Sequence, residues 1–116
     1  MTRDEARALW CAHGLTLDVI TDADIEDLRE RLDAEMRAHA ALPGFRANRV
    51  SKVRIPGKVQ YADITCRSDR FLRREAVTFE RNGFVGFAGW ADHENVQPVL
   101  RAFTAWVEAL VERVQA

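Results

Sequence analysis

An Asn82-Gly83 pair between two apolar runs, residues 71–81 and 84–90, is the feature of this sequence that most constrains its fold. Asn and Gly accept the positive φ angles of a two-residue hairpin loop, so the pair predicts two antiparallel strands joined tightly. A two-residue loop places the residues on either side of it opposite each other. This first pair then fixes every other cross-strand pair along the hairpin. Because side chains alternate between the faces of a strand, this register also predicts which residues share a face.

The predicted register gives the hairpin two apolar faces. The first carries Val77, Phe79, Phe84 and Trp90. The second carries Leu72, Ala76, Val85 and Phe87 beside Arg74. This second face is too apolar to be plainly solvated, so we expect either an N-terminal helix or another chain to cover it.

Two further turn signals extend the hairpin into a larger sheet. Pro56-Gly57 and Ser68-Asp69 separate stretches in which apolar and basic residues alternate, and this alternation is typical of strands. Three tight connections in succession join neighbouring strands in antiparallel fashion. The sequence therefore predicts a four-stranded antiparallel meander that begins at residue 46.

Helical periodicity flanks the predicted sheet. Thr2 with Glu5, and Thr21 with Asp24, form capping-box patterns ahead of two apolar stripes, the second over residues 22–41. A third stripe follows Asn95, the predicted N-cap of a C-terminal helix that packs on the sheet. The 116 residues therefore predict one α+β domain, residues 1–116, with two N-terminal helices, a meander and a closing helix.

The charge is distributed unevenly although the net charge is only −1. Residues 46–81 hold ten Lys and Arg against four Asp and Glu, whereas residues 1–45 hold five against ten. The basic excess lies on the predicted strands and turns. It either meets an acidic partner or pairs with the acidic helix over residues 22–35.

Compartment and membrane association follow from simple patterns. The N-terminus is charged and unlike a secretory signal, and no apolar run approaches the roughly 18 residues that span a bilayer. Cys11 and Cys66 lie far apart in the chain and are expected to be buried thiols. We therefore expect a cytoplasmic protein without a membrane segment.

Short motif fragments do not combine into a catalytic or metal site. His93-Glu94 begins like the helix of a zinc protease, but Gln97 occupies the position of the second His. Asp92 and His93 follow the fourth predicted strand and are the best candidates for a small enzyme site. The balance of the patterns predicts no cofactor, no metal and no enzymatic activity.

Residues 74–92 read Arg-Glu-Ala-Val-Thr-Phe-Glu-Arg-Asn-Gly-Phe-Val-Gly-Phe-Ala-Gly-Trp-Ala-Asp. Together with Asn95-Val-Gln-Pro98 and Phe103-Thr-Ala-Trp106, this stretch resembles small phage and prophage proteins. The resemblance covers only the C-terminal part of the chain, at turn, aromatic and packing positions. It implies a bacterial mobile element whose small proteins bind and modulate host proteins, for example as inhibitors of a host defence complex.

These patterns favour a non-enzymatic interaction module that binds a protein partner through a basic, partly apolar sheet surface. The residues expected to contact the partner are Lys52, Arg54, Arg70, Leu72, Arg74, Val85 and Phe87. A homodimer through the same apolar face is compatible with the pattern. Two other classes stay open: nucleic-acid binding through the basic segment, and a small enzyme centred on Asp92 and His93.

Overall fold

The computed structural model describes residues 1–17, 19–38, 46–55, 58–67, 74–80 and 84–115. In the first two strands it describes the backbone and, of the side chains, only those of Ile64 and Thr65. The helices are α1 (Arg3–Ala12), α2 (Asp22–Ala38) and α3 (His93–Gln115). The strands are β1 (Arg46–Ile55), β2 (Lys58–Arg67), β3 (Arg74–Glu80) and β4 (Val85–Phe87). The predicted α+β class is confirmed.

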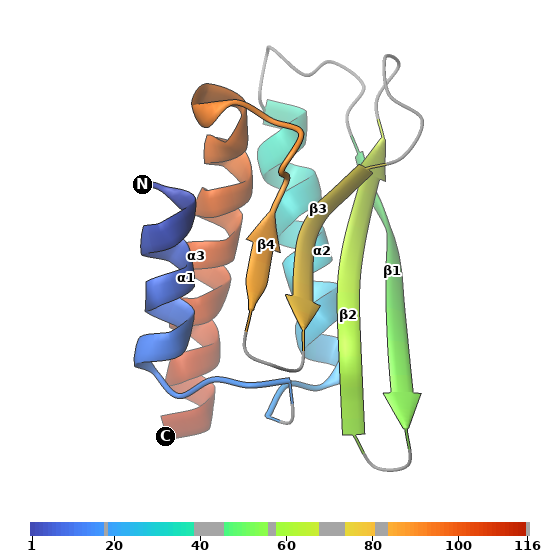
Figure 1. The fold of residues 1–116 in the computed structure, drawn as a ribbon, viewed down its shortest axis with the longest axis vertical. Coiled ribbons are helices and arrows are strands. Elements are labelled where there is room, and N and C mark those ends of the chain that lie inside the picture. Colours follow the sequence, from blue (N-terminus) through green and yellow to red (C-terminus); the bar gives the residue numbers. More distant parts are fainter. Residues whose placement is uncertain (18, 39–45, 56–57, 68–73, 81–83, 116) are drawn as a thin grey trace.

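The strands lie side by side in chain order, and each is antiparallel to the next. In Figure 1, α2 crosses behind the sheet, while α1 and α3 lie beside the β4 edge. The helix α3 contacts α1, α2 and β4, while α2 also contacts β1 and α1 also contacts β4. The front of the sheet in this view is therefore the face that the helices leave open.

Both N-terminal helices begin where their capping boxes predict. The Thr2 hydroxyl accepts from the Glu5 amide at 3.1 Å, and the Glu5 carboxylate accepts from the Thr2 amide at 3.2 Å. Thr21 and Asp24 repeat this exchange at 3.2 and 2.7 Å. Each reciprocal pair satisfies two amide groups that a helix start leaves without a backbone partner.

The closing helix begins earlier than predicted. Its first residue is His93, and the Asp92 carboxylate accepts from the Asn95 amide at 2.8 Å. Asp92 is therefore the N-cap, and the prediction of Asn95 in this role was wrong by three residues. The earlier start places Pro98 in the second helical turn rather than the first.

The β3–β4 hairpin differs from its predicted register by one residue. Val77 pairs with Phe87 and Phe79 with Val85, and the Glu80 amide donates to the Phe84 carbonyl at 2.9 Å. Three residues rather than two therefore separate the pair that closes the hairpin. Three-residue loops are the next most common connection after two-residue ones, and Asn-Gly is compatible with both lengths.

This shift exchanges the predicted faces of β4. Val85 and Phe87 are 1% and 2% exposed and face the helices, whereas Phe84 is 45% exposed on the other side. The prediction that Val85 and Phe87 lie on the opposite face of the hairpin from Val77 and Phe79 is therefore wrong. Val77 and Phe79 share the inner face with them, and all four side chains are buried.

An aromatic cluster fills the space between the sheet and the helices. Phe87 meets Phe103 of α3 edge to face, with ring centroids 4.7 Å apart. Trp10 of α1 stacks on Trp106 of α3 at 5.7 Å and lies 5.2 Å from Phe79 of β3. Because aromatic side chains bury large apolar areas, Trp10 fixes α1 to both the sheet and α3.

The register predicts losses of stability of very different size for Phe84 and Phe87. Phe87→Ala removes a buried ring and should lower the free energy of unfolding by about 3–5 kcal/mol. Phe84→Ala removes an exposed ring that contacts an arginine and should cost only about 1 kcal/mol. Denaturant unfolding of both variants measures the difference, and a larger loss for Phe84→Ala would contradict the register.

Candidate functional site

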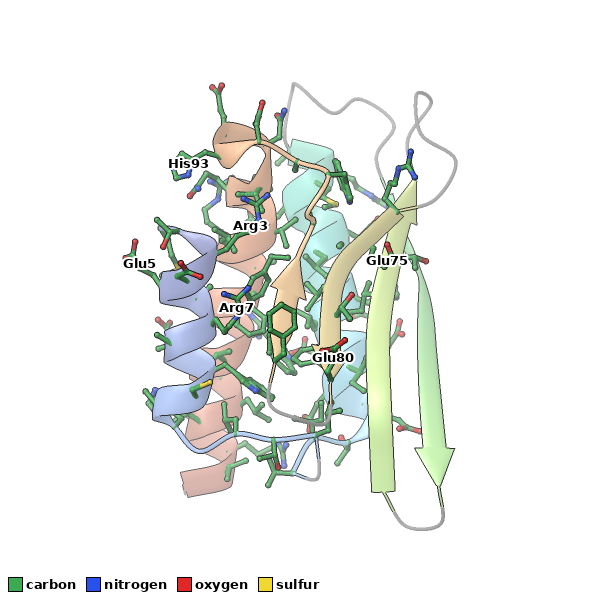
Figure 2. All side chains as sticks on the ribbon, in the orientation of Figure 1. Arg3, Glu5, Arg7, Glu75, Glu80 and His93 are labelled. Carbon is green, nitrogen blue, oxygen red and sulfur yellow. The ribbon has the colours of Figure 1, made fainter. Side chains whose placement is uncertain are left out.

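A hollow of about 910 Å³ lies over the open face of β3 and β4. One wall is α1, which turns Arg3 and Arg7 toward β4 (Figure 2). The residues that line the hollow are Arg3, Arg7, Arg74, Glu75, Thr78, Phe84, Gly86, Phe87, Ala88, Gly89 and Trp90. Three arginines and one glutamate give these walls a positive balance. The hollow is wide and open, which is the shape of a binding surface rather than an enclosed pocket for a small molecule.

Arg3 holds the turn between β4 and α3. Its Nε donates to the Phe87 carbonyl at 2.8 Å, and its Nη2 donates to the carbonyls of Ala88, at 3.0 Å, and Ala91. A guanidinium presents several donors in a fixed plane, so one side chain can reach three carbonyls of the same turn.

Arg7 is held in a similar way one helical turn later. Its Nε donates to the Val85 carbonyl at 2.8 Å, and its Nη1 contacts the Asp4 carboxylate at 2.6 Å. The centre of its guanidinium lies 4.7 Å from the centroid of the Phe84 ring, a cation–π distance. Phe84 and Arg7 therefore form one side of the hollow together.

The two arginines cover the outer edge of the sheet. The Ala88 amide donates to the Ala76 carbonyl and the Glu80 amide donates to the Phe84 carbonyl. The carbonyls of the alternate residues Val85 and Phe87 therefore point away from β3. Open carbonyls on an edge strand invite pairing with another chain. Arg3 and Arg7 occupy both of these carbonyls.

Two backbone features shape the floor of the hollow. A Cβ atom added to Gly86 would lie 3.3 Å from the Phe84 ring, so glycine allows this ring to lie across β4. Ala88 has a φ of +37°, which is uncommon for a residue with a side chain. Its amide donates to the Ala76 carbonyl, and its own carbonyl accepts from Ala91 and Arg3. These bonds hold the turn that ends β4 after three residues.

The predicted contact residues have different positions. Arg74 is exposed and lines the hollow. Val85 and Phe87 lie in the core, and of these two only Phe87 is among the residues that line the hollow. In the β1–β2 ladder, Lys52 pairs with Ala62 and Arg54 with Val59, but their side chains lie outside the described part of the structure. The other two predicted contact residues, Arg70 and Leu72, lie outside the described residues.

Sequence reasoning missed four residues that form the walls. Arg3 and Arg7 stand four residues apart and therefore share a face of α1, which is a signal that the sequence contains. Phe84 was assigned to the inner face by the incorrect register. The Trp90 indole donates to the Glu75 carbonyl at 2.9 Å, so Trp90 lies at the far end of β3 from the hairpin loop.

The acidic helix α2 pairs with arginines of helices in the described part of the chain. Arg29 and Arg31 contact acidic side chains within α2. Arg101 and Arg113 of α3 contact Glu35 and Asp24. These pairs join α2 to itself and to α3.

The candidate catalytic residues Asp92 and His93 both lie at the start of α3. Asp92 caps α3, and His93 is exposed on the first turn of that helix (Figure 2). Cys11 is exposed, so its expected burial was wrong. Among the described residues, no group of three or more His, Cys, Asp or Glu side chains could hold a metal ion. Across the same described ranges, no helix has the length and apolar character to cross a membrane.

Comparison with known proteins gives no relatives. No protein-family model, no curated protein and no solved structure matches this chain. The interpretation of the hollow therefore depends on its own geometry and chemistry.

Loss of the Arg3 clamp should weaken the fold. Arg3→Ala removes three hydrogen bonds from a charged donor and should lower the free energy of unfolding by about 2 kcal/mol. Arg3→Lys should have an intermediate effect because an ammonium lacks the planar fork. Arg101→Ala, which removes an exposed ion pair, is the control and should cost less than about 1 kcal/mol. Equal losses for Arg3→Ala and Arg101→Ala in chemical denaturation would show that the clamp is unimportant.

Asp92 should stabilise the protein as the N-cap of α3. Asp92→Ala should destabilise the protein by about 1 kcal/mol, whereas Asp92→Ser should largely preserve stability because a hydroxyl also accepts from the Asn95 amide. Thermal unfolding of both variants measures the effect. If the serine variant is as unstable as the alanine variant, the carboxylate has a role other than capping.

Proposed function

We propose that this protein is a non-enzymatic interaction module whose hollow over β3 and β4 binds an acidic segment of a protein partner. The observation that carries this proposal is the meeting of Arg3, Arg7 and Arg74 around an open apolar floor. Arginine and aromatic residues are enriched where protein interfaces gain most of their binding energy.

Apolar surface in the hollow supports contact with a protein chain. Phe84 is 45% exposed and contributes a ring that a partner can cover. Trp90 contributes a second aromatic surface at the opposite end of the hairpin. A partner that covers both rings buries apolar area, while the arginines between them determine which charge is accepted.

Charge complementarity supports an acidic occupant rather than a second copy of this chain. A symmetric dimer places the same patch of each copy against the other, so the three arginines would oppose three arginines. An acidic segment instead meets opposite charge. The sequence adds a basic excess over residues 46–81, which increases the attraction at longer range.

We extend the proposal to the fold that supports the hollow and to the kind of partner it binds. We take the full arrangement, a four-stranded meander with its helices on one face, as the rigid support for the hollow. The resemblance to phage and prophage proteins supports a cytoplasmic host protein as the partner, and inhibition of a host defence complex is one specific form of that role.

Affinity capture with charge-reversed variants tests the proposal. Purified wild-type protein should retain a partner from an extract of its native host, and Arg74→Glu should bind that partner at least tenfold more weakly in calorimetry. Arg101→Glu is the matched control because it reverses an exposed charge on α3 outside the hollow, and it should bind like wild type. A partner that binds Arg74→Glu and wild type equally would exclude the hollow as its site.

A further inference from the structure

The donors of Arg3 and Arg7 are only partly used within the protein. Arg3 engages its Nε and Nη2, and Arg7 engages its Nε and Nη1. Among the residues that the structure describes, Arg3 Nη1 and Arg7 Nη2 have no acceptor. Each guanidinium thus keeps one amino group for a group that enters the hollow.

These two guanidinium groups are already fixed in place. Backbone carbonyls of β4 hold both Nε atoms at 2.8 Å, and the Phe84 ring packs against Arg7. A ligand therefore does not have to immobilise two long side chains, which usually weakens binding by arginine. Residues four apart on a helix are neighbours, so the two positive charges present a short row along one wall.

We infer that this row recognises carboxylates, with Arg3 Nη1 and Arg7 Nη2 each donating to an acidic side chain of an extended partner segment. The inference rests on the proposed function and specifies its ligand chemistry. One amino group per arginine suits separate carboxylates on a peptide, because each makes a single charged hydrogen bond. Apolar residues between them then face Phe84 and the floor at Gly86.

Nearby acidic residues favour a peptide over a nucleic acid. Asp4 contacts Arg7 on α1, and Glu75 lines the hollow near Trp90. Glu75 and Glu80 lie at the two ends of β3 (Figure 2). A continuous phosphate backbone would pass these carboxylates and be repelled, whereas a peptide can place its acidic side chains only opposite the arginines.

Nuclear magnetic resonance can follow the predicted contacts directly. The probe is a short peptide in which Glu and Leu alternate, and the matched control peptide has Gln in place of Glu. The Glu peptide should shift the Nε–H signals of Arg3 and Arg7 and the indole N–H signal of Trp90. The indole N–H of Trp106 is the internal control, because it donates to the Asp24 carbonyl at 2.7 Å away from the hollow. Binding should weaken as salt is added.

Variants separate recognition from folding. Arg7→Gln should bind the Glu peptide at least tenfold more weakly while its Trp106 signal stays at the wild-type position, which shows an intact core. Arg101→Gln should bind like wild type. Equal binding of the Glu and Gln peptides would overturn carboxylate recognition. Oligothymidylate that shifts the arginine signals when the Glu peptide does not would also overturn it and would favour a nucleic acid.

Peptide binding at Arg3 and Arg7 and partner binding at Arg74 can be tested separately. If the Glu peptide shifts no arginine signal while a natural partner still depends on Arg74, the hollow binds that partner without the carboxylate row. If the peptide shifts the signals as expected but the natural partner ignores Arg74→Glu, the row recognises carboxylates and the partner site lies elsewhere.

Discussion

The packing of Phe87 against Phe103 is the contact on which the other features depend. It sets the inner face of β4, because burial of Phe87 brings Val85 to the same side and turns Phe84 outward. A one-residue shift would bury Phe84 and expose two apolar residues. The identity of the open face, and therefore of the hollow, follows from this single choice of register.

The position of α1 then determines which charges line the hollow. Trp10 stacks on Trp106 and anchors α1 beside β4. This anchor brings Arg3 and Arg7 to the carbonyls at the outer edge of the strand. The same two side chains therefore block strand addition at this edge and supply positive charge to the wall of the hollow. Stability and proposed recognition share one set of contacts.

Several features follow from local sequence rules. The capping boxes at Thr2 and Thr21 form as predicted because their hydrogen bonds span only three residues. The α+β class follows from periodicity that each segment carries by itself. The start of α3 at His93 was missed because Asp92 and Asn95 are both good N-cap residues. The residue types therefore do not show which of the two caps the helix.

The sequence by itself determined the class of fold, the place of the hairpin and the basic excess over residues 46–81. Only the tertiary structure decided the register, since Asn-Gly suits loops of two or three residues and the difference comes from packing on α3. Tertiary structure also made Arg3 and Arg7 part of the site. Their carbonyl partners lie more than 70 residues away in the chain, and no local pattern contains that contact.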